Sequence, residues 1–279
     1  MAGIDLHIHT IFSDGTYTPE EAVFQAKKLG LVAISITDHD SVAGLGSALV
    51  AGKSLGIEIV PGVEMSTDVG EDEIHILGYF LNWKKEDFLR QLEKFQAARA
   101  NRNQKLLKKL DDLGMRVDYR EVRKLAPHGV ISRLHIARLM VEKGYVRSIR
   151  AAFEQWLNPG KPAHVRKMKV PPFKIIELLL KAEAIPVLAH PVLSHRDDLI
   201  ADLVKAGLKG IEVYHGAHNP QVVAHYQRIA QKYHLLITGG SDCHGEAKDK
   251  VLMGKVRVPE TLLIDLKKAK EKIGCSTLA

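Results

Sequence analysis

Histidines and carboxylates recur along this chain at the ends of short apolar runs. The first group is His7-Ile8-His9, with Asp14 close behind, and the last is Asp242-Cys243-His244. Imidazole and carboxylate groups suit zinc, iron and manganese, and several on one rim can hold more than one ion. Such a centre is suited to metal-assisted hydrolysis. The candidate ligand set has nine members: His7, His9, Asp14, His39, Glu64, His75, His190, Asp242 and His244.

Apolar runs rich in Val and Ile alternate with amphipathic stretches. We expect strands at 4–8, 31–36, 57–63, 74–80, 185–189, 210–214 and 235–238. Between them the periodicity predicts helices at 18–29, 41–55, 172–183, 197–206, 219–233 and 259–272. Thr18-Pro19 and Asn219-Pro220 each place a capping side chain before a proline, which is typical of a helix start. The repeated strand–helix units indicate a parallel sheet, and seven of them suggest a barrel.

The candidate ligands fall where such a barrel would use them. Functional groups of an α/β barrel lie at the carboxyl ends of its strands, and His7 and His9 end the first expected strand. Because side chains alternate along an extended chain, these two rings point the same way and can share an ion. The other candidates follow later strand ends or, for His75, lie within the fourth strand: His39, Glu64, His75, His190, Asp242 and His244.

The pattern changes between about 84 and 165, where helical periodicity continues without a convincing strand. Leucines from Leu89 to Leu113 mark one or two long helices ended by Gly114, and shorter helices are expected at 118–125, 132–143 and 148–157. We therefore expect a barrel of residues 1–83 and 166–279 and a helical insertion of residues 84–165. Residues 84–170 hold 22 Lys and Arg against 9 Asp and Glu, a net +13 in a chain of net +7. Such a basic segment suits a nucleotide or a nucleic-acid strand.

Composition places the chain among ordinary globular proteins. It has 279 residues, of which 46% are hydrophobic and 26% are charged, enough for a sizeable core. Cys243 and Cys275 provide no disulfide framework. The sequence has no secretory signal pattern and no apolar run that could span a bilayer. We expect a soluble cytoplasmic protein with no membrane association and no obligate protein partner.

The motifs around these residues resemble those of the PHP (polymerase and histidinol phosphatase) superfamily. The matching segments are His7-Ile8-His9-Thr10, Ser13-Asp14-Gly15, Thr37-Asp38-His39-Asp40, Gly62-Val63-Glu64, His190-Pro191 and Ser241-Asp242-Cys243-His244-Gly245. The resemblance implies a distorted seven-stranded β/α barrel holding two or three divalent ions, Mn²⁺ foremost and Fe²⁺ or Zn²⁺ as alternatives. It also implies three ligand groups, the first two bridged by Glu64: His7, His9, Glu64 and Asp242; Glu64, His75 and His190; Asp14, His39 and His244.

The helical insertion is similar to that of nucleotide 3′,5′-bisphosphate phosphatases and 5′-to-3′ exoribonucleases of this superfamily. Ser132-Arg133-Leu134-His135-Ile136-Ala137 resembles their Arg-Pro-His segment, with Leu134 in place of Pro, and His164 stands where Tyr is expected. The resemblance implies that Arg133 and His135 contact substrate phosphate, whose oxygens a guanidinium fork matches. Cys243 replaces a larger apolar residue, and we expect it to pack away from the metals.

Further residues have secondary roles in this prediction. His215 and His218 follow the strand at 210–214, so we expect them to face the substrate. Asp38 and Asp40 flank His39 and are expected to orient ligands. His190 or His244 is a candidate to protonate the leaving oxygen. Weaker candidates for contact with a longer anionic substrate are Arg138, Lys161, Arg166, Lys167 and Lys169.

Together these features predict a metal-dependent phosphoesterase in which a metal-bridging hydroxide attacks phosphorus in line. The expected reactions are removal of the 5′-phosphate of a 3′,5′-bisphosphonucleotide and 5′-to-3′ cleavage of 5′-phosphorylated RNA, and the sequence is consistent with both. A small-metabolite phosphatase of the histidinol phosphate type is an alternative that the basic insertion disfavours. A non-catalytic nucleic-acid-binding module is another, disfavoured by the complete ligand set.

Overall fold

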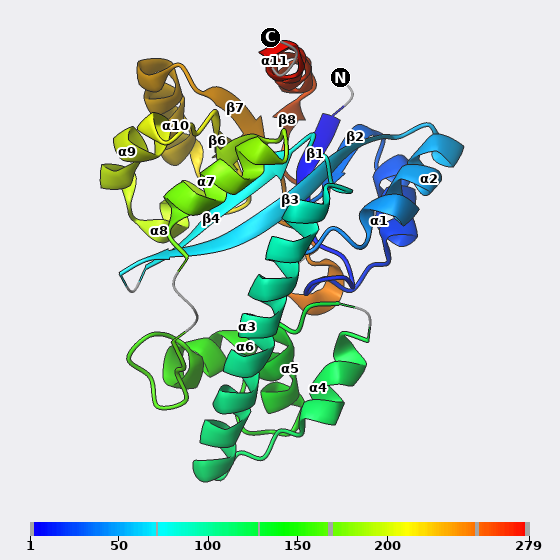
Figure 1. Cartoon of the computed structure of the whole chain (residues 1–279). Coiled ribbons are helices and arrows are strands. Elements are labelled where there is room, and N and C mark those ends of the chain that lie inside the picture. The colour runs from blue at the N-terminus through cyan, green and yellow to red at the C-terminus, as the bar shows by residue number, and fades with distance from the viewer. Residues whose placement is uncertain (1–2, 71, 128, 167–169, 249–250, 277–279) are drawn as a thin grey trace.

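An eight-stranded sheet forms the centre of the fold (Figure 1). The computed structural model describes residues 3–276 except 71, 128, 167–169 and 249–250. The order across the sheet is β7-β6-β5-β4-β3-β2-β1-β8. The strands are β1 (Gly3–Ile8), β2 (Leu31–Ile36), β3 (Glu58–Val69), β4 (Asp72–Tyr79), β5 (Ile185–Leu188), β6 (Gly210–Tyr214), β7 (Leu236–Gly239) and β8 (Val258–Pro259).

The sheet curls into a nearly closed barrel because the chain beyond β7 returns to β1. The backbone N–H of His9 donates to the carbonyl of Cys243 at 2.9 Å, and Ile8 and Cys243 form a parallel bridge. Gly240 permits this approach, since a Cβ at that position would overlap the Cβ and the backbone nitrogen of His7. The expected barrel is thus confirmed. It has one strand more than expected, because the two-residue β8, too short to recognise in the sequence, pairs with β1.

Three of the strand pairs are antiparallel, which corrects the expectation of a parallel sheet. β3 continues to Val69 instead of ending near residue 63, and the chain then turns back directly into β4. Parallel neighbours need a long crossover, so two strands joined by so short a turn pair antiparallel. The reversal brings the start of β4 to the rim where the parallel strands end. Ser66 and His75 are cross-strand partners there.

Helices pack against the sheet on both sides of this barrel (Figure 1). Thr18 and Asn219 cap α1 and α10 as expected, each accepting a hydrogen bond from a backbone N–H of the first turn. The helix expected at 41–55 begins only at Leu45, after a turn. The elements are α1 (Pro19–Lys28), α2 (Leu45–Leu55), α7 (Pro172–Lys181), α8 (Pro191–Ser194), α9 (Ile200–Lys205), α10 (Pro220–Tyr233), α11 (Thr261–Ser276) and the short 3₁₀ turns η2 (Asp197–Leu199) and η3 (Gly245–Ala247).

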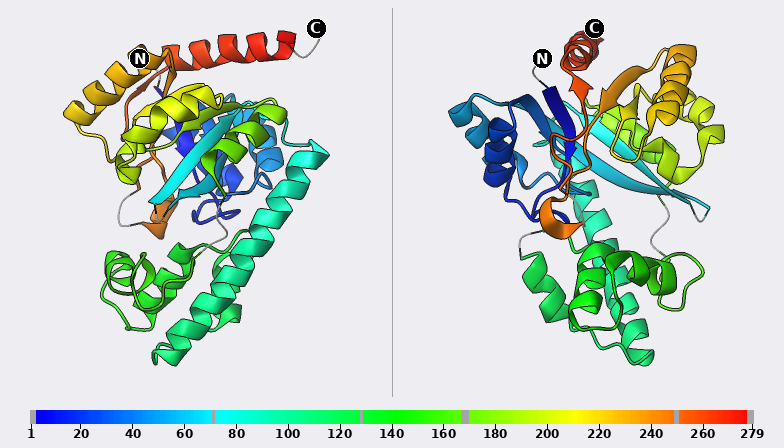
Figure 2. Two further views of the ribbon diagram at one scale, coloured as in Figure 1. Left: turned by 60° about the vertical axis from the view of Figure 1, so that its left-hand side comes forward. Right: turned by 180° about the vertical axis from the view of Figure 1, so that it is seen from behind.

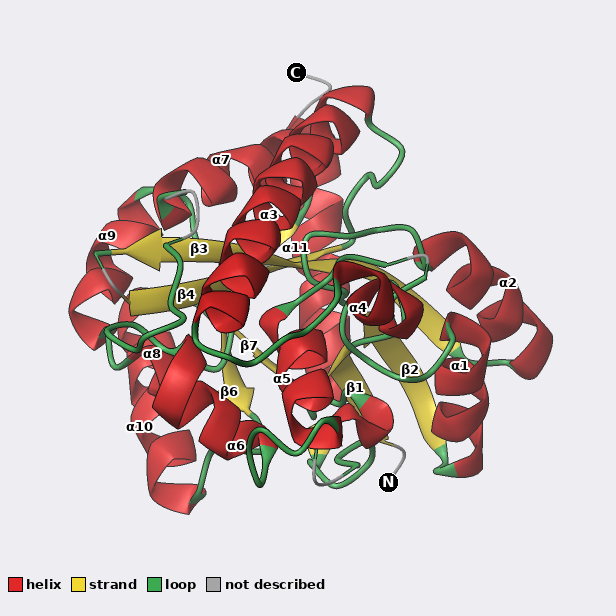
Figure 3. Ribbon diagram, turned by 90° about the horizontal axis from the view of Figure 1, so that it is seen from below, coloured by secondary structure: helices red, strands yellow, loops and turns green. Residues whose placement is uncertain are grey.

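A helical segment between β4 and α7 lies at the end of the barrel opposite α11 (Figure 2). Seen from below, its helices overlie the barrel (Figure 3). Its apolar side chains form a core of their own, whose buried members all fall between Leu106 and Ala163. The elements are α3 (Glu86–Asp112), α4 (Tyr119–Leu125), α5 (Arg133–Glu142), α6 (Ile149–Ala152) and the π-helix η1 (Phe153–Leu157).

Helix α3 connects the two cores. It has 27 residues and therefore spans about 40 Å. Phe88 and Leu92 pack in the barrel core, whereas Leu106 and Leu110 pack in the core of the helical segment. No helix among the described residues is both long and apolar enough to cross a membrane.

Gly240 offers a test of the barrel closure. Gly240→Ala should lower the free energy of unfolding by about 1–3 kcal/mol, since the new methyl group has no room against His7. Urea denaturation measures this change. Gly46→Ala is the matched control: its Cβ would meet only Trp83, at 3.8 Å, so it should be neutral or stabilising by up to about 1 kcal/mol. Equal stability of both variants would contradict the close approach.

Candidate metal centre and active site

β1 and the residue that follows it place two fully buried histidines, His7 and His9, at the rim of the barrel. Nδ1 of His7 donates to Glu212 Oε1 at 3.0 Å, and Nδ1 of His9 donates to Ser13 Oγ at 3.3 Å. These bonds fix both rings so that each Nε2 faces Glu64 and Asp242. The Nε2 atoms lie 3.3 and 3.2 Å from Glu64 Oε2, and 3.6 and 3.2 Å from Asp242 Oδ1.

Glu64 on β3 is the point where the predicted ligands converge. Its side chain is 1% exposed, and five imidazoles surround it. His39 Nδ1 lies 3.1 Å from Oε2, while His75 Nδ1 and His190 Nε2 lie 2.7 and 2.9 Å from Oε1. With His7 and His9, nitrogens from five histidines thus approach one carboxylate from β1, β4 and the loops after β1, β2 and β5.

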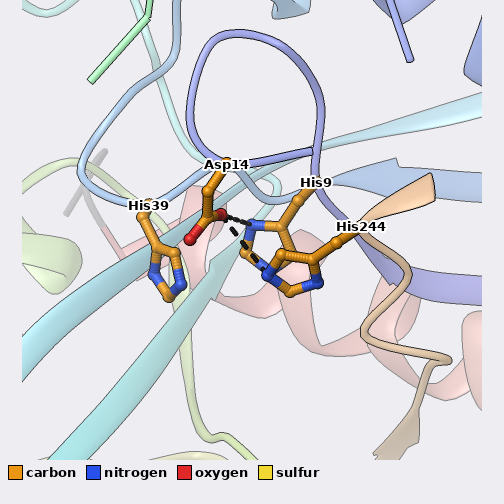
Figure 4. A group of neighbouring side chains, drawn as sticks. All are labelled: His9, Asp14, His39 and His244. Atoms are coloured by element: carbon orange, nitrogen blue, oxygen red, sulfur yellow. Dashed lines mark ion pairs between the residues drawn. The ribbon is translucent and has the colours of Figure 1, made fainter. Parts of the chain in front are cut away.

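A second carboxylate gathers a neighbouring group (Figure 4). Asp14 Oδ1 lies 3.3 Å from His244 Nε2 and 3.8 Å from His9 Nδ1. The rings of His9 and His244 are stacked with centroids 4.1 Å apart. His39 completes the group, and its ring also lies 4.6 Å from that of His9, so it stands between Asp14 and Glu64.

The nine predicted side chains lie together, and three groups among the described residues could each hold a metal ion. They are His7, His9, Glu64 and Asp242; His39, Glu64 and His75; and His9, Asp14, His39 and His244. The first is the group implied by the family resemblance. The second has His39 where His190 was expected, although His190 reaches the same carboxylate.

Buried polar atoms without partners support a role for these groups in metal binding. Within the described residues, these atoms are hidden from solvent yet form no hydrogen bond: Nε2 of His7, His9 and His75, Nδ1 of His39, Oδ1 of Asp14 and Oε2 of Glu64. Leaving a polar atom buried and unsatisfied costs about 1–3 kcal/mol. Divalent ions would satisfy all six, so the donor set fits a multinuclear centre.

Protons and metals compete for this cluster. Burial alone would raise the pKa of Glu64, but the charges of His39, His75 and His7 hold it well below its usual range. Burial would lower the pKa of His9, yet the carboxylates of Asp242 and Glu64 beside it raise the pKa to about 9. Burial lowers the pKa of His39 to about 3. Without metal the carboxylates are ionised and part of the imidazoles carry protons, which metal binding would release.

Two ligand positions have a strained backbone. His190 has φ 24° and Asp242 has φ 52°, both in the left-handed region that non-glycine residues seldom adopt. Each such residue costs about 1–3 kcal/mol and persists where surrounding structure holds it. His190 is held by its N–H, which donates to Glu212 Oε2 at 2.8 Å. The strain directs both side chains toward Glu64 and β1.

Glu212 on β6 is the main residue that the sequence analysis missed. Its buried carboxylate accepts from both His7 Nδ1 and the N–H of His190, so it orients two ligands. Asp5 has a similar role, accepting from the N–H groups of His7 and Ser241. The sequence does contain an indication of this role: Glu212 lies between Ile211 and Val213, at a strand position that faces inward. A buried carboxylate at such a position needs a hydrogen-bonding or charged partner.

Asp38 and Asp40 were expected to orient ligands, but their side-chain contacts are to residues outside the ligand set. Asp38 accepts from Thr10 and Ser13, the latter at 2.6 Å, and thereby fixes the loop after β1. Asp40 pairs with Arg99 and accepts from the N–H of Ser66.

A cleft of about 670 Å³ lies beside the clusters and is lined by His39, His75 and His244 together with the helical segment. Arg99 and Arg102 from α3 reach it. The sequence analysis did not predict a role for these two arginines, although both are charged residues of the expected long helix, between Leu92 and Leu106. Arg133 also lines it, paired with Glu73 at 2.7 Å and lying over the ring of Phe153.

His135 and His215 are both buried and oriented by backbone groups. His135 Nδ1 accepts from the N–H of Ser132, so the proton is on Nε2, which has no hydrogen-bond partner among the described residues. Burial lowers the pKa of His135 to about 4, so its imidazole is a neutral hydrogen-bond donor. His215 Nε2 lies 3.6 Å from Asp242 Oδ2, beside the first group.

The remaining candidate residues have contacts outside the three groups of possible metal ligands or lie outside the described residues. His218 donates to the carbonyl of Val213 and stacks on Tyr226 of α10. Arg138 is partly buried and Lys161 is exposed. Cys243 is buried in the barrel core, as expected. Lys167 and Lys169 lie outside the described residues.

Comparison with known proteins identifies the family. A model of the PHP domain matches residues 5–163, more than half of the chain. The chain belongs to the PHP domain family. The family resemblance inferred from the motifs is thereby confirmed.

Three known proteins are similar to this chain over more than four fifths of its length. The 3′,5′-nucleoside bisphosphate phosphatase of Chromobacterium violaceum is 31% identical over 88% of each chain. The 5′-3′ exoribonuclease of Haemophilus influenzae is 31% identical over 86% of this chain and 89% of its own. A solved structure from Bifidobacterium adolescentis, assigned as a candidate metal-dependent phosphoesterase, covers 95% of each chain with a TM-score of 0.88 and 28% identity.

The orienting role of Glu212 can be tested by metal titration. Glu212→Gln removes the charge that holds His7 Nδ1–H, and loss of such a partner weakens metal affinity by about 10- to 100-fold. Mn²⁺ binding measured against a fluorescent chelator should show this loss. Glu58→Gln, which removes an exposed carboxylate paired with Lys267, is the control and should bind normally. Unchanged affinity of Glu212→Gln would refute the role.

Proposed function

We propose that this PHP protein is a metal-dependent phosphoesterase acting on 3′,5′-bisphosphonucleotides and 5′-phosphorylated RNA. The observation that carries the proposal is the buried Glu64 carboxylate with five imidazoles around it, beside a cleft lined by arginines. The names of the Chromobacterium and Haemophilus relatives support the substrate class. In this proposal water is the attacking group, and no side chain of the cluster acts as a nucleophile.

The nine clustered side chains would hold the ions, with Glu64 shared between groups. Bound divalent ions supply Lewis acidity, which lowers the pKa of water and neutralises charge on phosphate. We propose Mn²⁺, although nitrogen and carboxylate ligands accept Fe²⁺ and Zn²⁺ as well.

The protein's own contribution is to hold and orient the phosphate. Arg133 faces the cleft and can exchange its contact with Glu73 for phosphate oxygens. His135 presents Nε2–H as a neutral donor. His190 and His244 lie 2.9 and 3.3 Å from carboxylate oxygens, so we assign both as ligands and leave protonation of the leaving oxygen to solvent.

One binding geometry can serve both proposed substrates. A 3′,5′-bisphosphonucleotide has the same structure as the first nucleotide of a 5′-phosphorylated RNA together with the phosphate on its 3′ oxygen. It lacks only the rest of the strand. A site that holds the 5′-phosphate and hydrolyses the ester at the 3′ oxygen therefore acts on both. We propose that residues 84–165, which supply Arg99, Arg102, Arg133 and His135, form the substrate-binding cap over this site.

Product analysis tests the proposal. With Mn²⁺, the protein should convert adenosine 3′,5′-bisphosphate to adenosine 5′-phosphate and release 5′-nucleotides from 5′-phosphorylated RNA, and chelation should abolish both reactions. Chromatography of the products measures this. A nucleoside 3′-phosphate would show instead that the 5′-phosphate is removed, as expected from the sequence alone. Turnover of histidinol phosphate alone would contradict the nucleotide assignment.

Arg133→Ala tests the phosphate contact. Loss of one charge-assisted hydrogen-bonding group should lower kcat/KM for the bisphosphonucleotide by at least about tenfold. Steady-state kinetics with saturating metal measure the change. Lys143→Ala removes a cation of the same helical segment that pairs with Glu121, and should leave kcat/KM unchanged. Equal activity of Arg133→Ala and the wild type would exclude Arg133 from phosphate binding.

A further inference from the structure

A second cavity, of about 410 Å³, lies on the side of the β3–β4 hairpin. Its walls come from three separate parts of the chain: described residues of the hairpin, including Asp68 and Asp72; residues after η1, including Asn158 and Arg166; and the segment from Leu193 to Arg196 at the end of α8. The clustered histidines of the metal centre do not line it. It is therefore a distinct space from the proposed reaction site.

The cavity adjoins the active-site cleft. Glu73, Arg102 and Arg133 line both spaces, so these three side chains form the shared boundary. Glu73 is also close to the metal centre, since its Oε1 lies 3.4 Å from His75 Nε2. A molecule bound at the clusters and extended past Arg133 enters the second cavity.

The lining is suited to phosphate groups. Arg102, Arg133, Arg166 and Arg196 contribute four guanidinium groups. Arg133 pairs with Glu73, and Arg196 pairs with Asp72 and Asp198.

Arg102 differs from these ion-paired arginines. It is 5% exposed, and its only described hydrogen bonds go to the side chain of Asn103. Burial, reinforced by Arg99 and Arg133, lowers the pKa of Arg102 to about 9. A bound anion would compensate this buried cation.

The cavity is partly open to solvent, since Asp72, Pro159, Arg166 and His195 of its lining are exposed. A mononucleotide could be held in a closed pocket, whereas a strand that continues beyond the site needs an opening through which to leave. This opening therefore favours a polymer over a mononucleotide as the occupant.

We propose that this cavity is a strand subsite that binds the phosphodiester backbone downstream of the scissile ester in a 5′-phosphorylated RNA. The inference rests on the proposed function, since it specifies where the rest of the strand lies. Bisphosphonucleotides end at the cleft and do not enter the subsite. Backbone contacts of this kind are independent of base sequence.

Arg196→Gln and Arg166→Gln test the subsite through substrate length. Each should lower kcat/KM for a 5′-phosphorylated hexaribonucleotide by about tenfold, the value of one charge-assisted contact, and leave the bisphosphonucleotide unaffected. Binding of a fluorescent hexamer in the presence of a chelator gives a readout without catalysis. There, the slope of log affinity against log salt should fall in magnitude by about 0.7 for each arginine–phosphate pair that a substitution removes.

Two controls separate binding from structure. Asp198→Asn breaks part of the Arg196 ion pair but keeps the guanidinium, so it should retain hexamer activity. Arg90→Gln removes an exposed, ion-paired arginine of α3 that does not line the cavity, and should match the wild type. If Asp198→Asn loses as much as Arg196→Gln, the effect is structural and the inference is wrong.

The remaining outcomes distinguish the inference from the function on which it rests. An equal loss of kcat/KM on both substrates would show that the cavity belongs to the mononucleotide site. No loss on either substrate would show that the cavity has no part in substrate binding. Both results overturn the subsite while leaving the phosphoesterase proposal intact. A wild type that cleaves neither substrate, yet binds the hexamer in a manner sensitive to Arg196→Gln, would support the subsite and overturn the proposed function.

Discussion

The burial of Glu64 among five imidazoles is the constraint on which the rest of the molecule depends. A buried carboxylate is costly unless opposite charge or hydrogen bonds surround it. Here the surrounding nitrogens come from β1, β4 and three loops, so most of the barrel must close before the charge is satisfied. Gly240 and Glu212 serve this closure, the first by allowing close backbone approach and the second by fixing His7 and His190.

Helix α3 extends the same constraint to the helical segment. Apolar residues near its two ends pack in different cores, while its middle carries Arg99 and Arg102. Because α3 is a continuous helix, packing at both of its ends also fixes the residues between them. The distance of the two arginines from the metal ligands is therefore set by both cores. Arg99 is further tied to the barrel through Asp40, whose neighbour His39 contacts Glu64. The groups that hold substrate and the groups that hold metal are thus parts of one network.

Much of this arrangement was predictable, and the failures have identifiable physical causes. The strands and the nine clustered side chains follow from local patterns, because alternation and strand ends are readable in sequence. The antiparallel β4 was not, since nothing in residues 57–63 marks that β3 continues to Val69. Glu212 and Arg102 were missed because their importance comes from neighbours distant in sequence. The ion pair of Arg133 with Glu73 was not predicted either, because Glu73 lies on another element.

The central claim is that Glu64 organises a multinuclear metal centre. Crystals grown with Mn²⁺, and data collected at the manganese absorption edge, test it directly. We predict anomalous peaks within the three groups of side chains around Glu64 and Asp14, with the Glu64 carboxylate between two of them. A map without peaks at these side chains, or in which Glu64 contacts none of the peaks, would contradict the account.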